Sequence, residues 1–207
     1  MLTILGKSPS INVRKVLWTC AEIGLDYRLE EWGAGYRATN EPSFLRLNPN
    51  ALVPVIQDGD DVLWESNTIC RYLAAKHGRA DLLPAAPMAR AQVEKWMDWQ
   101  VAELNNAWRY AFMGLVRRSP DHADPLAIEA SVNAWARHMA VLEGQLAISG
   151  AYVNGAQFCL ADIVLGLSVH RWMAAPITHP ALPAVEAYYE RLSTRAGFIA
   201  HGRNGMP

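Results

Sequence analysis

The hydrophobic pattern at the start of the chain predicts two strands separated by a helix. Residues 2–5 form a short apolar run, and residues 27–31 begin by alternating apolar and polar side chains, as a half-buried strand does. Between them, apolar residues recur at helical spacing over residues 12–22. A strand, a helix and a second strand in this order predict parallel pairing of the strands through a right-handed crossover.

The next patterned segment, residues 48–78, predicts a β-hairpin that leads directly into a helix. Two short apolar runs, residues 53–56 and 62–64, flank Asp58-Gly59, which is a strong hairpin-turn signal. Ser66 is the expected N-cap of the helix that follows. Gly78 is the expected C′ residue at its end.

Two features of this segment suit a small peptide ligand. Pro54 removes a backbone donor at the start of a strand, and the Val53–Pro54 bond is a candidate cis peptide. A cis bond there would leave the backbone of Val53 free to pair with an extended ligand. A helix that begins at Glu65-Ser66 presents free N–H groups and the positive end of its dipole, which together favour an anion.

From residue 88 onward the chain shows only the helical period. The proline- and alanine-rich residues 79–87 predict a linker, and residues 198–207 predict a poorly ordered tail. The predicted helices of this half cover residues 88–118, 125–149, 160–174 and 183–194. With a short helix at residues 42–47, the strands and helices of residues 1–78 follow a thioredoxin-like order. We therefore predict an α/β domain at 1–78 and an all-α domain at 88–207.

Composition narrows the possible partners. The 207 residues are 51% hydrophobic with a net charge of −1, and no basic run argues for nucleic acid. The apolar runs are too short to span a membrane, and the first ten residues lack the features of a signal peptide. We therefore expect a cytoplasmic protein that needs neither nucleic acid nor membrane.

The cysteines and histidines indicate no metal site. Cys20, Cys70 and Cys159 are odd in number, far apart and embedded in apolar patterns, so we expect buried free thiols rather than disulfides. The six histidines show no metal-ligand spacing.

A set of short motifs identifies a family resemblance. The chain resembles the glutathione-binding half of the cytosolic glutathione transferase superfamily, as a serine-type, bacterial theta- or beta-like member, in Asn48-Pro49, Val53-Pro54, Trp64-Glu65-Ser66, Ile69 and Tyr72-Leu73. The resemblance implies a thioredoxin-like domain followed by an all-helical domain that carries a second-substrate pocket. It also implies glutathione as co-substrate, a role in detoxification and a homodimer.

Ser10 and Asn12 are the candidate catalytic residues. Ser10 precedes the first helix, so its residue type alone indicates an N-cap. In serine-type relatives a serine at this place donates a hydrogen bond to the glutathione sulfur, a role compatible with capping. Asn12 is a second possible donor or, equally, an exposed polar residue, and Ser8 is a weaker alternative to Ser10.

The resemblance assigns the γ-glutamyl end of glutathione to two residues. Glu65 would meet the ammonium, and Ser66 with its backbone N–H would take the carboxylate. Without the resemblance, the same pair indicates only the start of a helix. Val53 would pair its backbone with the cysteinyl unit, next to Pro54.

The glycyl end of glutathione lacks its usual partner. Ala51 and Leu52 occupy the positions where many serine-type members carry His or Lys. Leu52 would therefore contact the glycyl end of glutathione with an uncharged side chain. Arg37 or Asn50 could replace the missing group.

In the helical half, aromatic residues indicate where the second substrate meets the protein. We expect Trp108, Tyr110 and Met113 to line an apolar pocket, and Trp96 to lie in the core or at a dimer interface. Asp162 is expected to be structural, accepting from the backbone N–H of Cys159 at a helix start where the family usually has Ser or Thr.

The sequence thus predicts a transferase that presents glutathione as a thiolate to an electrophilic, apolar substrate. Two alternatives stay open. The same site could serve disulfide reduction, isomerisation or dehalogenation, or the chain could be a binding module without activity.

Overall fold

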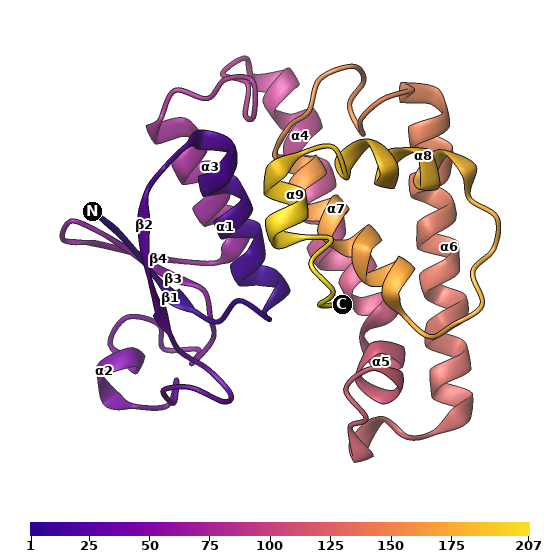
Figure 1. Cartoon of the computed structure of the whole chain (residues 1–207), viewed down its shortest axis with the longest axis horizontal. Helices are drawn as coiled ribbons and strands as arrows, with labels where there is room; N and C mark the ends of the chain where they lie inside the picture. Colours follow the sequence, from indigo (N-terminus) through magenta and orange to yellow (C-terminus); the bar gives the residue numbers. More distant parts are fainter.

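A four-stranded mixed sheet forms the first part of the computed structural model, which describes residues 1–207 (Figure 1). The strands lie in the order β2-β1-β3-β4, with β1 parallel to β2 and antiparallel to β3. Their bounds are β1 Leu2–Gly6, β2 Tyr27–Glu31, β3 Val55–Asp58 and β4 Asp61–Trp64. The predicted parallel pair and hairpin are both present.

Three helices accompany this sheet. Helices α1 (Ile11–Ile23) and α3 (Ser66–Lys76) pack against each other, and α2 (Pro42–Leu45) is a single short turn. Figure 1 shows α1 and α3 on the side of the sheet that faces the helical part of the chain. Gly78 has a φ of +64°, the left-handed conformation predicted for the residue that ends α3.

The rest of the chain is helical. A π-helical turn at Gln100–Leu104 joins α4 to α5 without a break, and a short 3₁₀ turn at Pro120–His122 precedes α6. The remaining bounds are α4 Pro87–Trp99, α5 Asn105–Leu115, α6 Pro125–Ser149, α7 Leu160–Ala174, α8 Pro183–Leu192 and α9 Ala196–His201. A thioredoxin-like sheet region followed by helices is the predicted fold class.

One continuous apolar core joins the two parts. Its 43 buried residues include Trp18 of α1, Trp135 of α6 and Trp172 of α7, so the sheet-bearing and helical parts are packed as one unit. Helix α1 contacts α7 and α9 as well as α3. The division at residues 78 and 88 stays a prediction.

Two local predictions were wrong. Ser66 is the first residue of α3, and its N-cap is Glu65, which caps with its backbone and makes no side-chain hydrogen bond. The tail is not poorly ordered, because α9 lies in it and its last residues are tied down. Arg14 donates to the carbonyl oxygen of Met206 at 2.7 Å, and Nε2 of His170 lies 3.1 Å from the same oxygen.

Asp162 is structural, as predicted. Its carboxylate accepts hydrogen bonds from the backbone N–H of Cys159 at 2.9 Å and of Val153 at 3.0 Å. It also accepts from the Cys159 thiol at 3.3 Å and from the Tyr188 hydroxyl at 3.0 Å. The fully buried carboxylate thus fixes the start of α7 against α8.

The three cysteines are free and buried, as predicted. Burial raises the pKa of Cys20 to about 12 and that of Cys70 to about 11, so neither thiol ionises at neutral pH. No three His, Cys, Asp or Glu side chains come close enough together to hold a metal ion. None of the helices has the length and apolar character needed to cross a bilayer.

Candidate functional site

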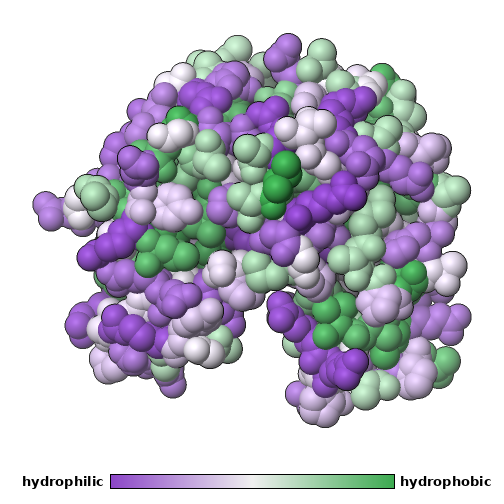
Figure 2. Space-filling model, in the orientation of Figure 1, coloured by the Kyte–Doolittle hydropathy of each residue, from purple (hydrophilic) through white to green (hydrophobic).

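A small pocket of about 50 Å³ brings together most of the residues that the sequence predicted to bind glutathione. It is lined by Asn12, Asn48, Leu52, Val53, Pro54, Glu65 and Ser66. The space-filling view shows a deep notch between the lobe that carries α2 and the lobe that carries α5 (Figure 2). In the same orientation, the start of α1 lies where the two lobes meet (Figure 1).

The loop before β3 supplies one wall of this pocket. The Val53–Pro54 bond is cis, and neither the N–H nor the C=O of Val53 has a partner within the protein. Asn48 fixes this loop, because its Nδ2 donates a hydrogen bond to the Leu52 carbonyl oxygen at 2.8 Å. Val53 therefore offers one donor and one acceptor of an open strand edge.

Asn48 was not among the predicted site residues, although it lines the pocket. Its Oδ1 accepts from the backbone N–H and from Nδ2 of Asn50, both at 3.0 Å. An asparagine before a proline is a turn signal in the sequence, and this position could have been identified from it. The side chain of Asn50 is turned toward Asn48 in this arrangement.

The start of α3 forms a second wall. Glu65 has a φ of +74°, a region that residues with a Cβ rarely occupy, and such strain is typical of functional sites. The backbone N–H groups of Ser66, Asn67 and Thr68 have no partners, as at any helix start. Ser66 itself is buried, so a carboxylate could meet its hydroxyl and these N–H groups together.

Ser10 and Asn12 occupy the start of α1. Ser10 is the N-cap residue by its backbone conformation, but its hydroxyl makes no capping hydrogen bond. The Oδ1 of Asn12 is enclosed and also lacks a partner. Of the two, Asn12 lines the 50 Å³ pocket. Both polar side chains lie at the positive end of the α1 dipole, where a negative charge is stabilised.

A buried polar network lies behind the pocket. The ammonium of Lys15 donates to Gln100 Oε1 at 2.8 Å and to Asn67 Oδ1 at 3.2 Å, and Gln100 Nε2 donates to Ser168 at 2.9 Å. Burial lowers the pKa of Lys15 to about 8. The network ties Asn67, the neighbour of Ser66, to the π-helical turn of the helical half. Sequence analysis missed it, because a lone lysine in an amphipathic helix gives no sign of burial.

Arg37 does not reach this pocket in the structure. Its guanidinium lies 3.7 Å from the centre of the Trp32 ring and 3.6 Å from the carboxylate of Glu41. The substitute partner for the glycyl carboxylate therefore stays a prediction for both Arg37 and Asn50.

The three residues predicted to line the second-substrate pocket lie in different surroundings. Trp108 is buried with its ring against Phe112, at 5.3 Å between ring centres. Tyr110 is half-buried and contacts the His122 ring at 4.9 Å, and half-buried Met113 packs against the main core. Trp96 is buried as deeply as Trp108, so burial alone does not separate core from pocket.

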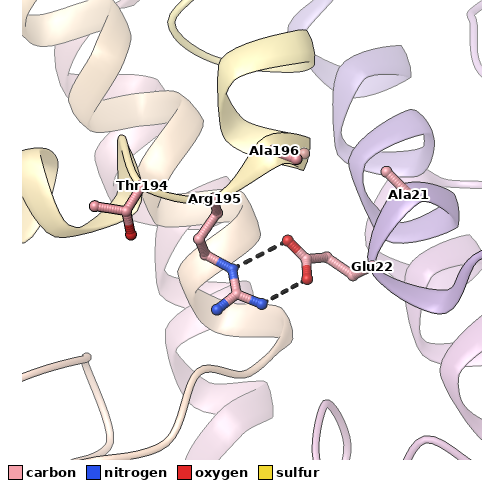
Figure 3. Close-up of a pocket in the computed structure, with 6 residues that line it drawn as sticks. Ala21, Glu22, Thr194, Arg195 and Ala196 are labelled. Carbon is pink, nitrogen blue, oxygen red and sulfur yellow. Dashed lines mark hydrogen bonds and ion pairs between the residues drawn. The ribbon is translucent and has the colours of Figure 1, made fainter.

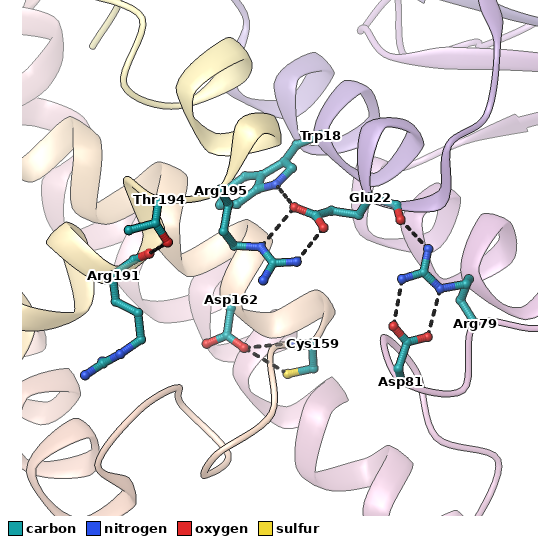
Figure 4. A network of polar contacts seen from close by, with 9 residues as sticks. All are labelled: Trp18, Glu22, Arg79, Asp81, Cys159, Asp162, Arg191, Thr194 and Arg195. Atoms are coloured by element: carbon teal, nitrogen blue, oxygen red, sulfur yellow. Dashed lines mark hydrogen bonds and ion pairs between the residues drawn. The ribbon is translucent and has the colours of Figure 1, made fainter.

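A larger hollow of about 280 Å³ lies at the opposite end of α1, between Ala21-Glu22 and residues 194–197 (Figure 3). Both oxygens of Glu22 accept from Arg195, at 3.1 and 2.5 Å, and Trp18 Nε1 donates to the same carboxylate at 2.8 Å. Figure 4 shows these groups beside the Arg79–Asp81 pair, with their polar atoms turned toward one another. This hollow has no unpaired reactive group, so we assign it a structural role.

A thioredoxin-like sheet and a helical region meet at an open strand edge and an anion-favouring helix start, and this combination defines the class of glutathione-dependent transferases. The family model "Glutathione S-transferase, N-terminal domain" matches residues 1–75. The chain is 38% identical over 197 residues to "Glutathione S-transferase GstB" of Escherichia coli (strain K12), covering 94% of each protein. The chain therefore belongs to the glutathione S-transferase superfamily and is an enzyme of that kind.

Two further relatives agree with this assignment. "Glutathione S-transferase 3" of Zea mays is 34% identical over 205 residues, which cover 95% of this chain and 91% of that protein. The crystal structure of a theta class glutathione S-transferase from Xanthomonas axonopodis pv. citri, with glutathione bound, superimposes with a TM-score of 0.90. It is 39% identical in sequence and the match covers 97% of this chain and 96% of that one.

Proposed function

We propose that this protein binds glutathione in the pocket between α1, the Val53 loop and α3, and activates it as a thiolate. The observation that carries the proposal is the convergence of unpaired polar groups on this pocket. The backbone of Val53, the first N–H groups of α3 and the side chain of Asn12 all lack partners there. A buried polar group without a partner costs free energy, so the enclosed Oδ1 of Asn12 in particular favours a bound ligand.

Each part of glutathione has a proposed partner. Val53 would pair with the backbone of the cysteinyl unit, as one strand pairs with another. Ser66 and the α3 N–H groups would take the γ-glutamyl carboxylate, and the exposed Glu65 would meet the ammonium. Leu52 would border the glycyl end through apolar contact alone.

The chemical step requires charge stabilisation rather than a base. A free thiol has a pKa of ~8.5, so most of it is protonated at neutral pH, and the thiolate is the nucleophile. A hydrogen bond to a charged group contributes roughly 1.5–3 kcal/mol, which corresponds to about one to two pKa units. Ser10 as donor, assisted by Asn12 and the α1 dipole, would make the thiolate the major form at pH 7.

The thiolate would then attack an electrophilic carbon held against α5. Trp108, with Tyr110 and Met113 near it, is the proposed apolar surface for that substrate. We further propose that the enzyme acts as a cytoplasmic homodimer in the detoxification of such electrophiles.

Binding and turnover test the proposal together. Calorimetry with glutathione should show binding to the wild type, and Ser66→Ala should weaken it by about tenfold through the lost hydrogen bond to a carboxylate. Ser43→Ala is the matched control, because Ser43 is an exposed serine of α2. Conjugation of 1-chloro-2,4-dinitrobenzene reports on the chemistry. Absence of glutathione binding at millimolar concentration would refute the proposed site, and binding without turnover of any electrophile would indicate a binding module.

A further inference from the structure

Two arginines are buried in this protein, and neither forms an ion pair with an Asp or Glu side chain. Arg14 of α1 is 1% exposed and Arg171 of α7 is 3% exposed. The exposed Arg117, just after α5, lies near enough to lower the pKa of both. Three guanidinium groups from three segments of the chain thus share one region between the two halves of the molecule, and none of them pairs with an Asp or Glu side chain.

Arg171 has no hydrogen-bond partner at all. Its Nε is enclosed without an acceptor, and its side chain lies over the rings of Trp108, at 4.4 Å, and Phe112, at 4.0 Å. These rings belong to the surface proposed for the second substrate. The contacts to the ring faces are favourable but they leave the guanidinium N–H groups unpaired. A buried cation without an anion is costly, because its charge has lost the stabilisation of water.

Arg14 places the same region close to the proposed sulfur site. It follows Ser10 by four residues, so the two side chains share one face of α1, with Cβ atoms ~6 Å apart. Its guanidinium donates to the carbonyl oxygen of Met206, at 2.7 Å, and to an oxygen of Pro207, at 3.2 Å, while its Nε has no acceptor. No Asp or Glu side chain forms an ion pair with Arg14.

The cluster remains positive under ordinary conditions. Burial and the charges of Arg14 and Arg117 lower the pKa of Arg171 to about 9, which still leaves it protonated at pH 7. Planar guanidinium groups match the two oxygens of a carboxylate and hold it with parallel hydrogen bonds.

We infer that the second substrate is an electrophile that carries a carboxylate, which Arg171 binds with support from Arg14 and Arg117 while the apolar part rests on Trp108 and Phe112. This inference rests on the proposed function and refines it, because the sequence predicted an apolar substrate and gave no sign of a charge on it. The reacting carbon would lie between the arginines and Ser10.

A pair of aryl chlorides, one with a carboxylate and one with the corresponding methyl ester, tests the inference. The probes are 4-chloro-3-nitrobenzoate and its methyl ester. With either one, the glutathione sulfur forms a bond to the ring carbon, the carbon–chlorine bond breaks, and chloride leaves with the bonding electrons. The thiol proton has already gone to solvent. The ester is intrinsically the better electrophile, so any preference for the acid reports on its recognition by the protein.

We expect the wild type to use the acid with a higher kcat/KM than the ester. Arg171→Met should lower the ratio of the acid's kcat/KM to the ester's by about tenfold to a hundredfold, as for a lost charged hydrogen bond. Arg117 is exposed, so Arg117→Gln should fold normally. It should lower kcat/KM for the acid by a few-fold, and this loss should be larger at low than at high ionic strength. Arg109→Gln removes an equally exposed charge from α5 and should leave the ratio of acid to ester unchanged.

The possible failures are distinguishable. If neither probe reacts and glutathione does not bind, the proposed function is wrong. If the ester reacts but the acid is no better than the ester, or if Arg171→Met and Arg117→Gln change both probes equally, the enzyme is a transferase and the carboxylate site is refuted.

Discussion

The two ends of helix α1 differ in how their polar groups are satisfied. At the C-terminal end, the Glu22 carboxylate accepts from Trp18 Nε1 and from Nε and Nη2 of Arg195. At the N-terminal end, the hydroxyl of Ser10 and the Oδ1 of Asn12 have no partner. The larger hollow lies at the satisfied end and the smaller one at the unsatisfied end.

This contrast shows that unpaired polar chemistry identifies a site better than the size of a hollow does. Folding normally leaves few buried polar groups without partners, so each one that persists needs an explanation. At the C-terminal end of α1 the explanation is structural, because the ion pair attaches α9 to α1. At the N-terminal end a ligand would supply the missing partners. The comparison predicts that mutations at one end change stability and those at the other change activity.

The largest expected effect is at the satisfied end. Glu22→Ala should lower the free energy of unfolding by about 3 kcal/mol, because it leaves Arg195 and the Trp18 N–H unpaired in a largely buried place. The kcat/KM of the folded variant should stay within about twofold of wild type. Denaturant titration and steady-state kinetics measure the two quantities. Asp26→Ala is the control, since Asp26 is exposed just beyond the same helix. A large loss of activity in folded Glu22→Ala would contradict the claim that this end of α1 contributes to stability alone.

Ser10→Ala should show the opposite behaviour. We expect kcat/KM for a fast electrophile to fall by about tenfold to a hundredfold, the cost of one hydrogen bond to a charged sulfur. Stability should change by less than about 0.5 kcal/mol, because the hydroxyl makes no capping bond to lose. Ser8→Ala serves as the neighbouring control. Equal losses in Ser8→Ala and Ser10→Ala would contradict the assignment to Ser10.

Asn12→Ala should have a smaller effect on activity. If Asn12 assists Ser10 as the secondary donor to the same sulfur, kcat/KM should fall by about three- to tenfold, less than for loss of the main hydrogen bond. Because Oδ1 is enclosed without a partner, stability should rise slightly or stay unchanged. A larger loss than in Ser10→Ala would make Asn12 the main donor.

The effect that is smallest near neutral pH is the protonation of His170, which contacts the C-terminal tail. Burial lowers the pKa of His170 from 6.5 to about 4, while its ring contacts Tyr189 and the Met206 carbonyl. The unfolded chain therefore binds the proton more readily, so stability should fall as the pH drops from 6.5 toward 4. One proton contributes at most about 1.4 kcal/mol per pH unit. His170→Gln should flatten the slope measured by denaturant titration, whereas an unchanged slope would exclude His170. His77→Gln, at an exposed position, is the control.

Local sequence chemistry was enough to predict the strands and helices around the sheet. Asp58-Gly59, Val53-Pro54 and Gly78 specify a turn, a strand start and a helix end through their own backbone preferences, and these features are present. The strained Glu65 could not be predicted, because nothing in its residue type favours a positive φ. The surrounding fold imposes that conformation.

Features that depend on contacts between distant segments were missed. Helix α9 is short and forms because Phe198 packs against Trp18, 180 residues earlier in the chain, at 5.0 Å between ring centres. The buried arginines are the clearest case. The residue types of Arg14 and Arg171 give no sign of burial, and only contacts with distant segments enclose them. Residues 201–207 cover Arg14, and the aromatic rings of α5 cover Arg171. Charge at a site between two halves of a chain cannot be read from the pattern of either half.

The most direct test of the central claim is the pKa of the glutathione thiol when it is bound. Thiolate absorbance in the ultraviolet, followed against pH at saturating glutathione, measures this value in wild type, Ser10→Ala and Ser43→Ala. The account predicts a value for wild type below about 7, roughly two units under the free thiol's ~8.5, and a shift back toward 8.5 in Ser10→Ala alone. A bound thiol that titrates like free glutathione in the wild type would contradict the claim that the start of α1 stabilises a thiolate.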